Sequence, residues 1–182
     1  MDNSPHALKR IEIDGLSVAE PAYLVASLRY FDSTGRFAAA VNEALGRPLA
    51  EPLRAVQVEP STDGAHFILA WRSPSENLLL CSDQAAFSAV ATNLAAEDGC
   101  MVDQSGGIRV VRVAGPRARD LLLRLGAATA LPDLGEARTG RLAELSVLTL
   151  CVRPFEYLLL VERVYAHHLL EWIHATAADI SQ

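Results

Sequence analysis

The order of apolar and polar positions divides the chain into two runs that are organised alike. Strands are predicted where β-branched and apolar residues alternate or run together, and helices where apolar residues recur every three or four positions. The expected strands are 26–32, 54–59, 65–72 and 77–81 in the first run, and 106–113, a long stretch at 141–152 and 157–162 in the second. The expected helices are 36–45, 83–96, 116–125 and 163–176.

A gapless offset of 80 residues aligns these two runs. It places SPSENLLL (73–80) over RPFEYLLL (153–160), so that a proline, a glutamate and three leucines coincide. It also pairs Gly35 with Gly115 and Arg29 with Arg109. Chance similarity in a chain rich in alanine and leucine is the alternative, but a shared block in one register favours an internal duplication.

The duplication decides the structure of residues 26–32, which by themselves resemble a helix. Their counterpart at 108–113 alternates and is rich in valine, so both segments are predicted to be strands. A strand–helix–strand–strand–helix unit places its helices on one face of an antiparallel sheet. We therefore predict an α+β fold of two tandem βαββα, ferredoxin-like units. Gly46 and Gly126 are expected to end their helices in the left-handed conformation.

The predicted boundaries follow from the same register. The first unit is expected at 21–98 and the second at 99–182, together forming one compact domain. Residues 1–20 are expected to be an N-terminal extension that contains one amphipathic, strand-like piece at 8–13.

Composition narrows the possible functions. Half of the residues are hydrophobic (51%) and the net charge is −6, with lysine or arginine nowhere dense. This argues against a nucleic-acid or anionic-membrane partner. No apolar run approaches the roughly 18 residues of a membrane helix, and the N-terminus lacks the features of a signal peptide. The three cysteines are widely spaced and are expected to be free core thiols, which predicts a cytoplasmic protein.

Few residues suggest chemistry. His167, Glu171 and His174 have the helical spacing of metal ligands, but a di-iron site needs a second set that the sequence lacks. A solvated or partner-facing helix surface is the favoured interpretation. Glu76 and Glu156 recur in both copies beside a proline, and we expect them to accept backbone N–H groups in turns. No catalytic, cofactor-binding or metal-binding residue is predicted.

Aromatic side chains point instead to contacts with another protein. Tyrosine and tryptophan dominate interfaces when partly exposed, although each could equally be a core residue here. The candidates lie at the ends of elements or on the last helix: Trp71, Tyr157, Tyr165, His168 and Trp172.

With these residues in place, most of the chain, from about 26 to 178, resembles the gamma subunit family of heterotetrameric sarcosine oxidase. That family is itself similar to part of the aminomethyltransferase (glycine-cleavage T protein) fold. The most specific stretches are VDQSGGIRVVRVAGPRARDLL (102–122), LLVERVYAHHLLEWI (159–173), and LGRPL (45–49) followed by WRSPSENLLL (71–80). The family usually has GPDEWL at the last place, where this chain has Ser73, Ser75 and Asn77.

The resemblance implies a non-catalytic subunit of a flavin-dependent complex that demethylates sarcosine or another N-methyl amino acid. It implies FAD, FMN, NAD and tetrahydrofolate on the companion alpha and beta chains and none on this one. Two alternatives remain open at this level: a free-standing folate-binding or aminomethyltransferase-like protein, with Glu76 or Glu156 holding the pterin, and a homodimeric regulatory module.

Overall fold

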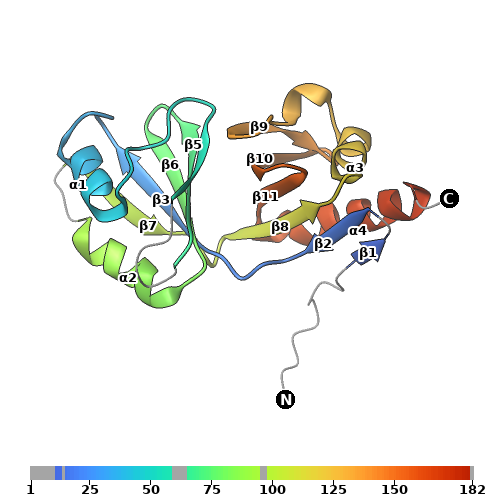
Figure 1. The fold of residues 1–182 in the computed structure, drawn as a ribbon, viewed down its shortest axis with the longest axis horizontal. Coiled ribbons are helices and arrows are strands. Elements are labelled where there is room, and N and C mark those ends of the chain that lie inside the picture. Colours follow the sequence, from blue (N-terminus) through green and yellow to red (C-terminus); the bar gives the residue numbers. More distant parts are fainter. Residues whose placement is uncertain (1–10, 14, 59–64, 95–97, 181–182) are drawn as a thin grey trace, which may run out of the picture. The chain divides into compact units, whose positions relative to one another are not determined.

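The computed structural model describes residues 11–13, 15–58, 65–94 and 98–180 (Figure 1). They form two compact units, each with its own antiparallel sheet and pair of helices. This confirms the predicted α+β fold with two tandem ferredoxin-like units. Within the described ranges, no helix combines the length and apolar character needed to span a membrane.

The first unit comprises residues 22–106 and 135–137. Its sheet has the order β4-β5-β6-β3-β7, and all neighbours are antiparallel. Helices α1 and α2 share one apolar core with this sheet. The elements in chain order are β3 (Leu24–Tyr30), α1 (Arg36–Leu45), β4 (Ala55–Val58), β5 (Phe67–Ser73), β6 (Glu76–Cys81), α2 (Gln84–Asn93) and β7 (Gly99–Asp103).

The second unit comprises residues 1–21, 107–134 and 138–182. Its sheet has the order β1-β2-β8-β11-β10-β9 and shares a second core with helices α3 and α4. The elements are β1 (Ile11–Ile13), β2 (Leu16–Ala19), β8 (Ile108–Ala114), α3 (Ala118–Leu125), a 3₁₀ turn (Ala128–Ala130), β9 (Glu136–Leu142), β10 (Leu145–Arg153), β11 (Glu156–Glu162) and α4 (Arg163–Ile180).

The predicted elements are present, and three strands separate the helices of each unit. These are the three expected strands in the first run, whereas in the second run the expected stretch at 141–152 falls on the end of β9 and on β10. The segment 26–32, which the register assigned to a strand, overlaps β3 and extends two residues beyond its end. The hairpins β5–β6 and β10–β11 turn at Pro74 and Pro154, and Glu76 and Glu156 are the first residues of the following strands.

The sheets divide the chain differently from the predicted boundaries. β2 lies in the expected extension, yet it pairs with β8 and buries Leu16 and Val18 in the second core. β7 lies in the expected second unit but pairs with β3 of the first. Each sheet is thus completed by the strand that precedes the first strand of the other unit. A short strand such as LSVA does not encode its pairing partner locally, so the register could not reveal this exchange. The first part of the predicted piece at 8–13 lies outside the described residues.

The offset of 80 residues holds over part of each unit. It superposes the helix ends at Leu45 and Leu125 and the strand starts at Glu76 and Glu156. It is wrong for the first strand: Glu76 is paired with Arg29, whereas Glu156 is paired with Ala114 and not with Arg109. The connection from this strand through the helix is shorter in the second unit, so a gapless alignment cannot span it.

The glycines that follow α1 and α3 differ in conformation. Gly46 ends α1 in the left-handed region (φ 65°), as predicted. The prediction is wrong for Gly126, which is extended (φ −169°). Its Cα hydrogen faces the chain at Arg141, and a Cβ there would overlap the Arg141 carbonyl oxygen. Gly126 is therefore required for a close approach of two backbones, and not for a left-handed turn.

Candidate functional site

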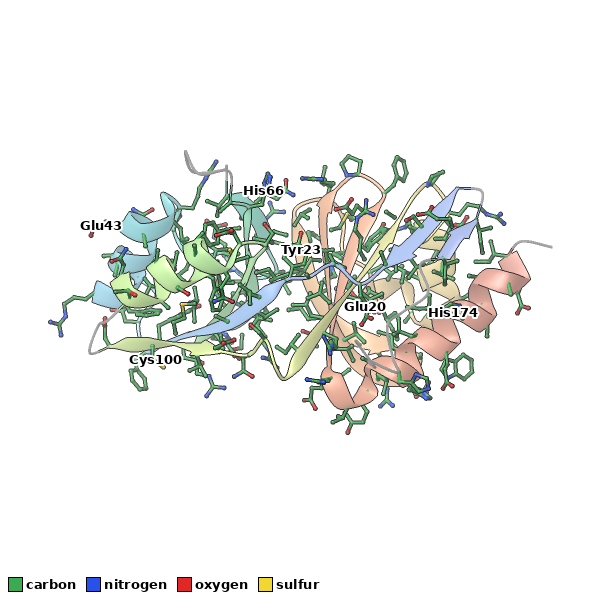
Figure 2. The ribbon with its side chains drawn as sticks, turned by 90° about the horizontal axis from the view of Figure 1, so that it is seen from below. Glu20, Tyr23, Glu43, His66, Cys100 and His174 are labelled. Carbon is green, nitrogen blue, oxygen red and sulfur yellow. The ribbon has the colours of Figure 1, made fainter. Side chains whose placement is uncertain are left out.

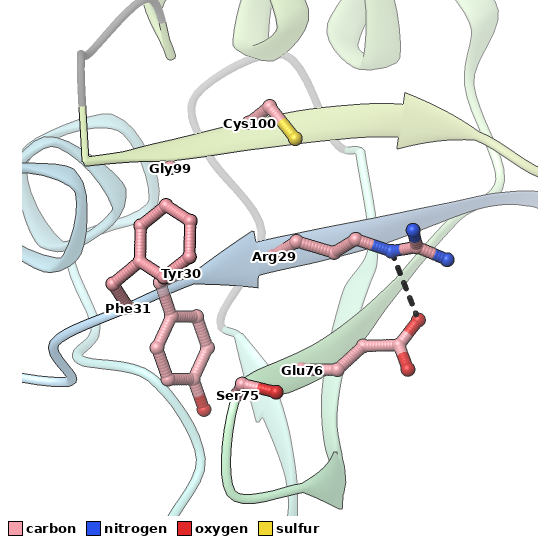
Figure 3. Close-up of a pocket in the computed structure, with 7 residues that line it drawn as sticks. All are labelled: Arg29, Tyr30, Phe31, Ser75, Glu76, Gly99 and Cys100. Carbon is pink, nitrogen blue, oxygen red and sulfur yellow. Dashed lines mark ion pairs between the residues drawn. The ribbon is translucent and has the colours of Figure 1, made fainter.

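A cavity of about 600 Å³ opens in the first unit, where β3 ends beside β6 and β7 (Figure 3). It is bordered by the ends of three strands and by the turn before β6. The lining residues are Arg29, Tyr30, Phe31, Ser75, Glu76, Gly99 and Cys100.

Glu76 is the polar centre of this cavity. Its side chain is mostly buried, and Ser27 donates a hydrogen bond to Oε1. Arg29 Nε lies 3.9 Å from the same oxygen (the dashed line in Figure 3), and Arg72 Nη1 donates to it at 3.4 Å. Arg29 Nε also donates to the Ser27 hydroxyl at 3.2 Å. One carboxylate is therefore shared by two guanidinium groups, which leaves the cluster with a net positive charge.

Glu156 occupies the corresponding place in the second unit. Arg112 Nη2 donates to its Oε2 at 2.6 Å, a charge-assisted hydrogen bond with the glutamate side chain mostly buried. The expectation that Glu76 and Glu156 accept backbone N–H groups is wrong for the described residues, because both carboxylates take side-chain donors. Each glutamate is the first residue of its strand. Its side chain extends toward the neighbouring strand of the sheet instead of toward the backbone of the preceding turn.

A second polar pair lies on the opposite face of the same sheet. Asn77 is fully buried, accepts from the Ala50 N–H at 2.7 Å and donates to the Tyr30 hydroxyl at 2.9 Å. Burial raises the pKa of Tyr30 above its ordinary value, and the negative charge of Glu76 adds to the increase while the hydrogen bond from Asn77 opposes it. Asn77 therefore ties β6 to both β3 and the segment after α1.

The cysteines are only partly as predicted. Cys81 and Cys151 are buried core thiols, and burial raises the pKa of Cys81. Cys100 is exposed, which corrects the prediction, because β7 is the edge strand of its sheet. Figure 2 shows Cys100 on that strand.

The polar residues of α4 lie on its surface. His167 Nε2 is 3.3 Å from Glu171 Oε1, and both side chains are more than 60% exposed. His174 is exposed as well (Figure 2). Within the part of the chain that the structure describes, no three His, Cys, Asp or Glu side chains gather closely enough to hold a metal ion.

The five aromatic candidates separate into two groups. Tyr157 is buried, with Arg119 donating to its hydroxyl at 3.4 Å, and Trp71 packs partly buried against the first core. Tyr165 and Trp172 are about half exposed, and His168 is exposed with its ring centroid 6.3 Å from that of Trp172. Val164, which the sequence did not single out, is 78% exposed beside them. We call the exposed surface of Val164, Tyr165, His168 and Trp172 the α4 patch.

Sequence reasoning missed most of the residues around Glu76. Ser27 and Asn77 have no counterpart of the same type in the second unit, so the duplication gave them no weight. The offset did pair Arg29 with Arg109, but the residue opposite Glu156 is Ala114, so this pairing did not reveal the contact of Arg29 with Glu76. The available signal was the presence of an arginine, Arg29, within an otherwise mostly apolar strand.

Two solved structures illustrate the similarity of the fold. A chain of the heterotetrameric sarcosine oxidase from Corynebacterium sp. U-96, solved with pyrrole 2-carboxylate, matches 95% of this chain and 89% of its own length, with a TM-score of 0.79 and 20% identity. The glycine cleavage system aminomethyltransferase T from Bartonella henselae matches 87% of this chain with a TM-score of 0.62 and 12% identity. This chain spans about half of that protein, 45% of its length.

The sequence comparisons give no family. No family model matches the chain, and no curated protein sequence matches it significantly. At such low sequence identity, the structural similarity establishes a shared fold and nothing further. The chain thus has the fold of a subunit of heterotetrameric sarcosine oxidase, which is also that of part of an aminomethyltransferase.

Proposed function

We propose that this chain is a non-catalytic, structural subunit of a heteromeric, flavin-dependent oxidase that acts on sarcosine or another N-methyl amino acid and is coupled to tetrahydrofolate. The observation that carries the proposal is the match of nearly the whole chain to nearly the whole of one chain of a heterotetrameric sarcosine oxidase.

The character of the polar residues supports a structural role. The carboxylates of Glu76 and Glu156 are both engaged by arginine side chains that connect neighbouring strands. Such pairs fix strand positions and leave neither of these two carboxylates free to act as a general base. In this proposal FAD, FMN, NAD and tetrahydrofolate are bound by the companion alpha and beta chains, as the family resemblance implies.

The α4 patch is the surface that we assign to a companion chain. An exposed valine, a tyrosine and a tryptophan on one helix provide large, rigid, apolar contact area, which is typical of interface anchors. His168 beside Trp172 extends the same surface.

Co-purification tests the proposal. The chain, tagged and produced together with the products of neighbouring genes, is expected to retain flavin-bearing chains. They would be visible by flavin absorbance at about 450 nm and by peroxide release on addition of sarcosine. The tagged chain alone should show neither. A chain that stays monomeric and colourless beside folded flavoprotein partners would contradict the proposal.

The free-standing folate-binding alternative draws on the likeness to the aminomethyltransferase fold. It requires Glu76 or Glu156 to hold the pterin, yet each carboxylate is already hydrogen-bonded to arginine. A pterin bound to either carboxylate would have to displace an arginine donor from it. Calorimetric titration of the isolated chain with a reduced folate is therefore expected to give no binding heat. A saturable signal lost in Glu76→Gln would favour the alternative.

A further inference from the structure

The two sheets differ by one strand at the same place. In the second unit, β2 borders β8 and carries β1 on its outer side. In the first unit, β7 borders β3 in the same way, and the described residues supply no strand outside it. Val18 opposite Val113 corresponds to Met101 opposite Leu28, so the place that β1 fills on β2 is the outer side of residues 99–101 on β7.

The outer side of β7 presents backbone groups suited to pairing. At the two ends of the β3–β7 pair, the Phe31 N–H donates to the Asp98 carbonyl and the Gln104 N–H donates to the Val25 carbonyl. Because these bonds alternate along an antiparallel pair, Cys100 and Val102 also point their backbone groups inward, whereas Gly99, Met101 and Asp103 point theirs outward. Among the described residues, no backbone group is bonded to these three. The strand contains neither lysine nor proline, two common protections of an edge.

The side chains around this edge define what would fit it. Met101 is partly buried against the first core, as Ile11 and Ile13 of β1 are against the second. An added strand therefore needs apolar residues opposite Met101 and Gly99. Phe31 is 94% exposed at the cavity that Gly99 and Cys100 border, which provides further apolar contact.

The other face of the edge is positively charged. Arg29 is the neighbour of Cys100 on β3, its side chain is 60% exposed, and its contacts with described residues use only Nε. In β1 the residue at the corresponding place is Glu12, which accepts from Ser17 Oγ at 3.0 Å. A residue two strands from Arg29 is about 10 Å away, a distance that the arginine and a glutamate together can span. A carboxylate opposite Cys100 would therefore complement Arg29.

We infer that the outer edge of β7 binds an extended segment of a partner polypeptide as an added antiparallel strand, with an apolar–acidic–apolar sequence facing Met101, Cys100 and Gly99. Main-chain bonds supply affinity in this mode and the alternate side chains supply specificity. Pairing of β7 with the β7 of a second copy fits less well, because alignment about Met101 puts Val102, and no carboxylate, opposite Cys100. The inference holds whether or not the companion is a flavoprotein.

The test uses the full ¹⁵N-labelled chain and a synthetic peptide with the sequence of residues 9–14, KRIEID, with blocked ends. Shift changes in the NMR spectrum are expected on β7. Amide exchange at Gly99, Met101 and Asp103 should slow about tenfold when the peptide is near ten times its Kd. The peptide KRIKID should bind at least about threefold more weakly to the wild-type chain, and Arg29→Gln should remove this difference.

Two variants separate edge pairing from unfolding. Met101→Pro removes an outward N–H that β3 does not use, a place where an edge strand tolerates proline, and should weaken KRIEID binding about tenfold. Met101→Val keeps the N–H and should bind within about twofold of wild type, with both variants folded by circular dichroism. The inference is overturned by no binding at millimolar peptide, by shifts confined to β2 and β8, or by unchanged binding to folded Met101→Pro. Co-purification with flavoproteins is independent of all three outcomes.

Discussion

Thr149 is a buried residue whose polar atom works against the fold. It lies on the helix-facing side of β10, fully buried, and its Oγ1 has no hydrogen-bond partner among the described residues. A buried hydroxyl without a partner keeps its full desolvation cost, and valine has nearly the same shape without that cost. Thr149→Val is expected to raise the free energy of unfolding by about 1 kcal/mol, measured by urea denaturation. Thr149→Ser, which keeps the hydroxyl and loses the methyl group, should lower it.

Tyr30 and Cys81 make stability depend on alkaline pH. Burial raises the pKa of each above its ordinary value, 10.0 for the phenol and 9.0 for the thiol. The folded state therefore favours the protonated forms, so their contribution is complete below these values and is lost as the pH rises through the raised pKa. The free energy of unfolding should fall progressively above about pH 9.

Two substitutions separate the contributions of Tyr30 and Cys81 to this loss of stability at alkaline pH. Tyr30→Phe should flatten the upper part of the profile and Cys81→Ala the part that begins nearer pH 9.0. Tyr30→Phe should also cost about 1 kcal/mol at neutral pH, because Asn77 then loses the acceptor for its Nδ2. Denaturant titrations from about pH 7 to 11 measure both effects. A Tyr30→Phe profile parallel to wild type at high pH would contradict this assignment.

At the level of single residues, sequence reasoning located Glu76 and Glu156 and misjudged their partners. A glutamate shortly after a proline commonly accepts hydrogen bonds in a turn. The sequence around each glutamate does not show that Arg29 and Arg112 lie on the neighbouring strands. Nothing in the local sequence indicated that Tyr157 lies in the core. An aromatic at the start of a strand has the same local pattern whether it faces a core or a partner.

Among the elements, the glycines after α1 and α3 allow a direct comparison. Gly46 has a left-handed backbone and open space around it, so Gly46→Ala should lower the free energy of unfolding by about 1 kcal/mol. Gly126 has an ordinary backbone, but an added Cβ meets the Arg141 carbonyl and the Leu142 side chain. Gly126→Ala should therefore cost about 2–3 kcal/mol, because a backbone group must move. If urea denaturation gave equal losses of unfolding free energy for the two variants, the backbones at Gly126 and Arg141 would be able to move apart at little cost.

The elements were largely predictable because each carries its own period. β8, with IRVVRVA, and α3, with its stripe of Ala118, Leu121, Leu122 and Leu125, are encoded locally. The exchange of β2 and β7 was not, since strand pairing depends on which edges meet after the chain folds back. For the same reason, the local sequence could not show that the two sheets have different numbers of strands.

For the whole molecule, the α4 patch gives the decisive prediction. Its aromatics lie on the exposed side of a helix whose other side, including Leu169 and Ile173, is fully buried, so they contribute little to folding. Replacing both Tyr165 and Trp172 with serine should leave the thermal midpoint within about 2 °C of wild type. Association with flavin-bearing chains should weaken at least about thirtyfold, the effect of losing even one buried interface aromatic worth about 2 kcal/mol.

The matched control is Leu134→Ser, which removes an exposed leucine (57%) elsewhere in the second unit and should change association by less than about twofold. The two readouts separate the possible roles of α4. If the patch is ordinary solvated surface, both variants will assemble as wild type does, because a scattered exposed apolar residue contributes nothing to binding. If the aromatics support the fold, the double variant will lose thermal stability and association together. Only a folded, equally stable variant that fails to retain the flavoproteins identifies α4 as the docking surface, and sedimentation of the purified mixtures beside flavin absorbance distinguishes these outcomes.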